Sequence, residues 1–177
     1  ASEMNSDIIT PVLMGIMLGG LYALIANGLS LVFGVMRLIN LAHGDLVILG
    51  SYFAYAILTL LGLDPLIGLI ISVPVMFCLG FLIQKYLMSK AFAISSETPL
   101  IIAFGISLII QNANQIAWTP LSRALNTTYA QKSFFIGELQ LPLIYLFDFI
   151  AGIIVMVLLH VFLKSNYLGR AITAASQ

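Results

Sequence analysis

The residues best suited to chemistry lie close together in one short stretch of an otherwise apolar sequence. Residues 34–46 read GVMRLINLAHGDL, and they bring together a guanidinium, an amide, an imidazole and a carboxylate, on Arg37, Asn40, His43 and Asp45. Such groups cost free energy inside a membrane unless they are paired, so they mark solute paths, proton relays or other functional sites.

The backbone around these residues is expected to be broken. In one continuous helix, Arg37 and Asp45 would lie about 12 Å apart along the axis, too far to form an ion pair. A break at Gly44 would let Arg37 approach Asp45 and would free backbone groups to line a cavity. Asp45 is then expected to cap the following helix, and His43 to satisfy backbone groups at the break. We therefore predict a broken or re-entrant segment near residues 37–45.

The elements that must position these residues are predicted to be membrane-spanning helices. Hydrophobic residues make up 61% of the 177 residues and charged residues only 8%, with a mean hydropathy of +1.10. A soluble domain is about 25% charged, so most of this surface is expected to face lipid. The seven basic and seven acidic residues cancel, which leaves no basic field for a nucleic acid. The composition predicts an all-α integral membrane protein that contacts the lipid bilayer and no nucleic acid.

Five apolar runs have about the 20 residues that a helix needs to cross a bilayer core of about 30 Å. They cover residues 8–35, 46–63, 66–83, 100–118 and 143–163. Three dipeptides pair a capping residue with a proline and so predict helix starts: Thr10-Pro11, Asp64-Pro65 and Thr98-Pro99. In the first run, Gly15 and Gly19 form a GxxxG pattern, which predicts a face where another helix approaches closely.

The basic residues predict the orientation of the chain. If the N-terminus is outside, five basic residues fall in inner segments, whereas two, Arg123 and Lys132, fall in outer segments. The inner five are Arg37, Lys85, Lys90, Lys164 and Arg170. Because basic residues are enriched in cytoplasmic segments, we expect the chain to be N-out and C-in.

Several stretches resemble one family of membrane proteins. Residues 20–52 (GLYALIANGLSLVFGVMRLINLAHGDLVILGSY), 98–112 (TPLIIAFGISLIIQN) and 167–171 (YLGRA) are similar to the LivH-type permease subunits of branched-chain amino acid ABC importers. The resemblance covers nearly the whole chain from residue 8 onward. Family members are longer, so it implies that residues 1–177 form a single transmembrane permease domain that lacks the C-terminal spans.

The resemblance also implies a function and a set of partners. The chain would form the translocation path for a small solute, with branched-chain amino acids as the first expectation and urea or short amides as alternatives. The expected partners in a bacterial-type inner (plasma) membrane are a second permease subunit, cytoplasmic ATPase subunits and an extracytoplasmic solute-binding protein. ATP would be used by the partner subunits, since this sequence contains no GxxxxGK[ST] phosphate loop. No cofactor is expected in this chain, which is not expected to be an enzyme.

The candidate site residues fall into two groups. Those for the translocation path or the helix break are Asn27, Arg37, Asn40, His43, Gly44, Asp45, Gln111 and Asn112. The amides among them can instead form hydrogen bonds between helices. By the resemblance, Gly169 and Arg170 lie where the permease couples to its ATPase, although Arg170 can equally be a positive-inside anchor.

Two other classes of function follow from the same residues. Asp45 and His43 could relay protons in a stand-alone, proton-coupled secondary transporter or channel for a small polar solute. An intramembrane enzyme is disfavoured, because His43 and His160 are the only histidines and no GxSxG or HExxH motif accompanies them. No catalytic or metal-binding residue is therefore predicted.

Overall fold

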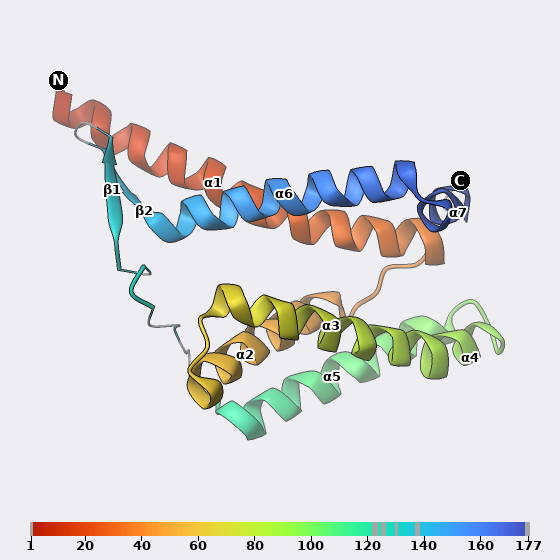
Figure 1. Ribbon diagram of the computed structural model, residues 1–177. Helices are drawn as coiled ribbons and strands as arrows, with labels where there is room; N and C mark the ends of the chain where they lie inside the picture. Colours follow the sequence, from red (N-terminus) through yellow and green to blue (C-terminus); the bar gives the residue numbers. More distant parts are fainter. Residues whose placement is uncertain (1, 122–123, 125–126, 130, 137–138, 176–177) are drawn as a thin grey trace. The chain divides into compact units, whose positions relative to one another are not determined.

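The computed structural model describes the chain except for residues 1, 122–123, 125–126, 130, 137–138 and 176–177. Arg123, which enters the predicted orientation, lies outside the described residues. The helices are α1 (Ser2–Met36), α2 (His43–Leu61), α3 (Pro65–Ile83), η1 (Gln84–Met88), α4 (Ser89–Phe92), α5 (Thr98–Trp118), α6 (Leu143–Ser165) and α7 (Tyr167–Ala175). Two strands, β1 (Ser133–Ile136) and β2 (Leu139–Pro142), form a short antiparallel hairpin (Figure 1).

The predicted membrane-spanning architecture is confirmed. In the described part of the chain, five helical stretches are long and apolar enough to cross a membrane. They are Ile8–Met36, His43–Leu61, Pro65–Phe92, Thr98–Trp118 and Leu143–Ser165. The third stretch joins α3, the π-helical turn η1 and α4 without a loop, so it continues well past the predicted end at residue 83.

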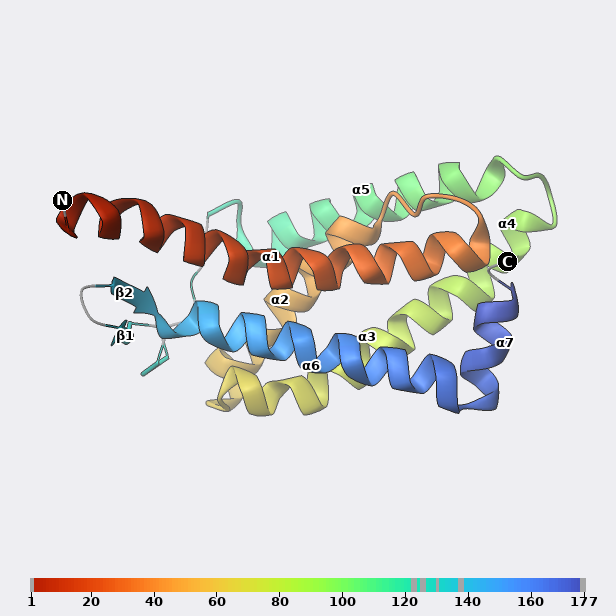
Figure 2. The same cartoon turned by 90° about the horizontal axis from the view of Figure 1, so that it is seen from above.

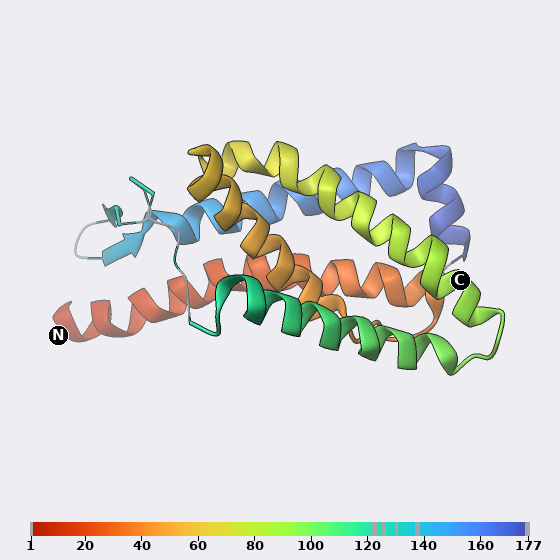
Figure 3. The same ribbon diagram turned by 90° about the horizontal axis from the view of Figure 1, so that it is seen from below.

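The chain divides into two compact units. One contains Ala1–Arg37 and Asn126–Gln177, and the other contains Leu38–Leu125. In the first unit, α1 lies beside α6, and α7 turns across the end of α6 (Figure 2). In the second unit, α2 crosses obliquely between α3 and α5 (Figure 3). The single permease domain over residues 1–177 stays a prediction.

Two glycines make a close contact between α1 and α6 in the first unit. A methyl group on Gly152 of α6 would lie 3.0 Å from the carbonyl oxygen of Gly20, and one on Gly20 would lie 2.9 Å from the Phe149 ring. Gly15 and Gly19, which form the GxxxG pattern, have no such neighbour within 4 Å among the described residues. The close approach therefore occurs at Gly20, next to the predicted pattern.

The predicted helix starts hold at two of three places, and the predicted side-chain cap at one of them. Asp64 caps α3, since its Oδ1 accepts a hydrogen bond of 2.9 Å from the amide of Leu66. Pro11 does not open a helix but lies inside α1, where spanning helices tolerate proline because neighbouring groups satisfy the freed carbonyl. Thr98 is the first residue of α5, and its amide donates to the Ser95 hydroxyl at 3.2 Å, so the cap comes from three residues earlier.

Candidate functional site

The backbone is broken between α1 and α2, as predicted, but the break precedes Gly44. Helix α1 ends at Met36, and Arg37 adopts a left-handed conformation with φ of 54°. Residues 37–42 are not helical, and Gly44 lies within the first turn of α2. The predicted break at Gly44 was therefore misplaced, because Arg37 rather than a glycine makes the turn. The predicted approach of Arg37 to Asp45 stays a prediction.

Asn40 organises the turn that leads into α2. Its side-chain Oδ1 accepts a hydrogen bond of 3.0 Å from the amide of Ala42. Its backbone carbonyl accepts one of 3.1 Å from the amide of His43, the first residue of α2. An amide side chain that bonds the backbone two residues on is the usual device of such turns. In the structure, Asn40 thus acts locally, and His43 follows it as a partly buried residue.

Asp45 does not cap α2, contrary to the prediction. The residue in the cap position is Ala42, which makes no side-chain capping bond, and Asp45 is the third residue of the helix. A capping side chain must lie before the first turn, so the Asp45 carboxylate is free to turn towards another helix. It accepts a hydrogen bond from the hydroxyl of Ser107 on α5. Its place in the first turn still suits the positive end of the helix dipole.

Ser107 is the start of a line of polar side chains along α5. The hydroxyl oxygen of Ser107 accepts a hydrogen bond of 3.1 Å from the amide nitrogen of Gln111, one turn further on. Asn114 follows on the same face, and only 7% of it is exposed. We call Asp45, Ser107, Gln111 and Asn114 the α2–α5 polar row. The row brings a carboxylate, a hydroxyl and two amides together between two spanning helices.

An aromatic pair lies beyond Asn114, at the end of the α2–α5 polar row that is distant from Asp45. The ring of Tyr52 on α2 stacks on that of Trp118 on α5, with 4.9 Å between the centroids and 16° between the planes. Ser107 and Trp118 therefore both meet α2. Asn114 lies between these two contacts and, at 100° per residue, on nearly the same face as both. It is thus part of the face of α5 that meets α2.

The end of the α2–α5 polar row at Asp45 and Ser107 lies deep in the predicted membrane. Ser107 is about 13 Å along α5 from its first residue, Thr98, at 1.5 Å per residue. This distance is close to half of a bilayer core of about 30 Å. Because Asp45 is bonded to Ser107, the first turn of α2 lies level with the middle of α5. Irregular backbone at such depth is tolerated only where it is buried in protein or lines a cavity, as the predicted re-entrant segment requires.

Of the two predicted amide residues on α5, the structure places only Gln111 in the polar row. Both side chains are exposed, but that of Gln111 bonds to Ser107 and so belongs to the row, whereas that of Asn112 donates to the carbonyl of Leu108 on its own helix at 2.7 Å. Ser107 and Asn114 were not among the residues predicted from the sequence. Their spacing from Gln111, four residues before it and three after, puts all three on one face of a helix and could have identified them.

Asn27 lies in the other unit and lines a separate pocket. This pocket of about 310 Å³ lies where α1, α6 and α7 meet. Its lining residues are Asn27, Ser30, Leu31, Gly34, Val35, Leu163 and Ile172. Asn27 and Ser30 are the polar residues among them. The structure therefore places Asn27 with the α7 end of its unit.

The predicted coupling residues, Gly169 and Arg170, lie in the first turn of α7. Gly169 is buried, and a methyl group there would overlap the carbonyl oxygen of Phe162 and the Cα of Leu163 in α6. Only a glycine therefore lets α7 pack this closely on the end of α6. The amide of Arg170 donates to the carbonyl of Asn166 at 3.0 Å, and the side chain of Arg170 is exposed.

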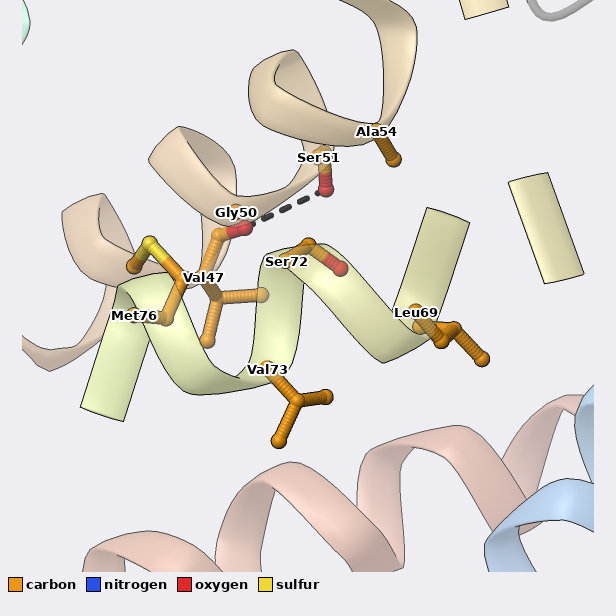
Figure 4. Close-up of a pocket in the computed structure, with 8 residues that line it drawn as sticks. All are labelled: Val47, Gly50, Ser51, Ala54, Leu69, Ser72, Val73 and Met76. Atoms are coloured by element: carbon orange, nitrogen blue, oxygen red, sulfur yellow. Dashed lines mark hydrogen bonds between the residues drawn. The ribbon is translucent and has the colours of Figure 1, made fainter. Parts of the chain in front are cut away.

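A second pocket lies between α2 and α3. Its volume is about 330 Å³, and its lining is apolar except for Ser51 and Ser72. The remaining lining residues are Val47, Gly50, Ala54, Leu69, Val73 and Met76. Figure 4 shows the two serines on facing turns of α2 and α3, with the Ser51 hydroxyl bonded to the carbonyl of Val47 at 3.2 Å. The pocket has the character expected for an aliphatic group.

The chemistry of these sites is that of binding. The α2–α5 polar row presents one carboxylate whose hydrogen-bond donor is a neutral hydroxyl, and that hydroxyl is itself bonded to an amide. Among the described residues, no group of three or more His, Cys, Asp or Glu side chains could hold a metal ion. A carboxylate held in this way between two spanning helices can receive a polar group that passes along them.

Known proteins with similar sequences are transport proteins. Residues 12–177 match the family described as branched-chain amino acid transport system / permease component. The chain is similar to the high-affinity branched-chain amino acid transport system permease protein BraD of Pseudomonas aeruginosa, with 32% identity over 184 residues. It is 26% identical over 176 residues to the LivH permease protein of Salmonella typhimurium, and 26% identical over 181 residues to that of Escherichia coli. In each case the match covers 92% of this chain and 57% of the relative's length. No solved structure matches the chain.

Proposed function

The chain belongs to the permease family of branched-chain amino acid transport systems, and on that premise we propose that it forms part of the translocation path of an ATP-driven importer. Family membership and the five spanning helices make it a multi-pass protein of the inner membrane. The chain spans 57% of the length of the curated relatives that it matches.

One observation carries the proposal most directly. The α2–α5 polar row lies within helices of spanning length, and its carboxylate is held in the middle of α5 by a hydroxyl. A carboxylate at such depth is costly unless it serves a path or a partner. The row therefore supports a path for a polar solute between or beside α2 and α5.

The solute proposed for this path is a branched-chain amino acid. Such a solute has a charged, polar end and a branched aliphatic end. The α2–α5 polar row suits the first of these, and the apolar pocket of about 330 Å³ between α2 and α3 suits the second. The relatives BraD and LivH are named for branched-chain amino acid transport, which supports the same choice.

The proposed partners follow from the same premise. A second permease subunit would complete the path, cytoplasmic ATPase subunits would hydrolyse ATP, and an extracytoplasmic solute-binding protein would deliver the solute. We assign α7, with Gly169 and the exposed Arg170, to the contact with the ATPase. This requires the N-out, C-in orientation, which the basic residues Lys85, Lys90 and Lys164 at the ends of their helices support.

Reconstitution of the full-length importer tests the proposed function. The full-length permease, its partner permease and the ATPases would be placed in proteoliposomes, and labelled leucine uptake would be measured with and without ATP and the binding protein. We expect uptake only when both are present, and competition by isoleucine and valine but not by urea or acetamide. Uptake that persists without the ATPases would refute the importer. Flux driven by a proton gradient through the permease alone, and lost in Asp45→Asn, would instead support the stand-alone transporter.

A further inference from the structure

The α2–α5 polar row leaves two side-chain oxygen atoms available as hydrogen-bond acceptors. The Ser107 hydroxyl donates to Oδ2 of Asp45, and the amide nitrogen of Gln111 donates to Ser107. Both donors therefore point inward along the row, towards the carboxylate. The second oxygen of that carboxylate and the side-chain oxygen of Asn114 are left to accept further hydrogen bonds.

Asn114 is the most unusual member of the row. It is 7% exposed, and its Oδ1 accepts no hydrogen bond from any residue that the structure describes. A buried acceptor without a partner costs about 1–3 kcal/mol, and natural proteins leave few of them. Leucine would fill nearly the same space on this apolar helix without that cost. The asparagine oxygen is thus placed for a hydrogen-bond donor that comes from outside the described residues.

The charge of the row indicates which donor this is. Asp45 forms no ion pair with any described residue, so the row presents a carboxylate without a cation. A neutral donor such as water or urea could bond to Asn114, but it would leave this charge uncompensated. An ammonium group carries a positive charge that suits Asp45 and N–H donors that suit Asn114, so it fits each acceptor in turn.

We propose that the α2–α5 polar row binds the ammonium group of the transported amino acid, with Asp45 and Asn114 as two successive acceptors. Ser107 and Asn114 are about 10 Å apart along α5, so one ammonium group cannot contact both acceptors at once. It would pass from one to the other as the solute moves. This inference rests on the proposed function and adds the group of the solute that is recognised. It also excludes urea and short amides as preferred solutes, since they lack a positive charge.

Substitutions at Asn114 test the inference in the assembled, full-length importer. Asn114→Leu removes the acceptor and keeps the volume, so we expect leucine import, measured with saturating loaded binding protein, to fall by about tenfold or more. Its thermal unfolding temperature should be unchanged or higher, because an unpaired buried oxygen is lost. Asn114→Asp keeps an acceptor oxygen and adds a negative charge, so import should be retained.

The matched control is Asn112→Leu, two residues away on the same helix. The Asn112 side chain is exposed and bonds to its own helix, so import should stay within about twofold of wild type. If Asn114→Leu imports leucine as fast as the wild type does, the inference is overturned. This result is expected if Asn114 binds only water. Loss of import in both Asn114→Leu and Asn114→Asp would also overturn it, because the added charge should favour an ammonium group.

The two proposals fail in different ways. If the wild-type importer takes up no leucine with ATP and binding protein present, the proposed function is wrong. If the wild type imports leucine and Asn114→Leu does so equally well, only the role of the α2–α5 polar row is wrong.

Discussion

The hydroxyl of Ser107 on α5 is hydrogen-bonded to the carboxylate of Asp45 on α2, across 62 residues of sequence. Ser107 is 6% exposed, so water does not compete freely for the bond. This hydrogen bond fixes the position of α2 along the axis of α5 and orients the Asp45 carboxylate.

Removal of this hydroxyl should loosen α2 from α5. For Ser107→Ala we expect a loss of about 1 kcal/mol in the free energy of unfolding, since hydrogen bonds between spanning helices are worth about 0.6–1.7 kcal/mol. Import should fall as well, because the carboxylate loses its orientation. Thermal unfolding in lipid nanodiscs and leucine uptake measure the two effects. Thr59→Ala is the control, since the Thr59 side chain is exposed and its hydroxyl bonds to carbonyls of Tyr55 and Ala56 in its own helix. Equal losses in both variants would contradict the assignment.

The stacked rings of Tyr52 and Trp118 should contribute a measurable pairwise energy. Stacked aromatic pairs are worth about 0.5–1.5 kcal/mol beyond the area they bury. We expect a double-mutant cycle with Tyr52→Leu, Trp118→Leu and the combined variant to give a coupling energy in this range. Unfolding of the three variants and the wild type in nanodiscs provides the four values. Strict additivity of the single effects would show that the two rings do not support each other.

The contact between Gly20 and Gly152 should make α1 and α6 sensitive to a single methyl group. Gly152→Ala would place a carbon 3.0 Å from a backbone oxygen that cannot rotate away, so the helices must separate. Overpacking of this kind costs about 1–3 kcal/mol. The matched control is Gly15→Ala, because a methyl group there meets no described atom within 4 Å. A drop in unfolding temperature for Gly152→Ala alone is the expected result.

Gly169 should be required for coupling more than for insertion. A methyl group at this position overlaps backbone atoms of Phe162 and Leu163, so Gly169→Ala should displace α7 from the end of α6. We expect normal amounts of permease in the membrane, but at least about tenfold less ATP hydrolysis stimulated by the loaded binding protein. Arg170→Ala removes a charge without changing the packing of α7 on α6, since the Arg170 side chain is exposed, so it distinguishes an effect of charge from an effect of packing. Full stimulation in Gly169→Ala would remove α7 from the coupling role.

The spanning helices could be predicted because lipid imposes one simple requirement, a long apolar run. The predicted boundary of a span is wrong where polar residues form part of the helix. The second span was expected to begin at residue 46, but α2 begins at His43 and includes Gly44 and Asp45. Hydropathy excludes these three residues, whereas the turn built by Asn40 makes them the first turn of the helix. Because of the same turn, the backbone break lies before Gly44 rather than at it.

The partners of the polar residues could not be predicted, because they depend on how each helix is rotated. Asn112 and Asn114 are the same residue type on the same helix, and only the packing of α5 decides that Asn114 is buried and Asn112 exposed. The glycine contact has the same origin. The sequence showed a glycine-rich face on α1, but Gly152 on α6 has no comparable pattern around it, and its pairing with Gly20 arises only from the crossing of the helices.

The π-helical turn Gln84–Met88 has a consequence for the length of the third span. Its backbone hydrogen bonds reach five residues back rather than four, as in the bond from the backbone amide of Ser89 to the carbonyl of Gln84. The turn thus holds one residue more than an α-helical turn, and the residues beyond it are rotated by about 100°. Met88 at the end of this turn and Ala91 beyond it are 2% and 0% exposed. Deletion of a single residue here would therefore leave an unbroken helix whose last two turns present the wrong side to α5, so the segment should tolerate substitutions far better than changes in chain length.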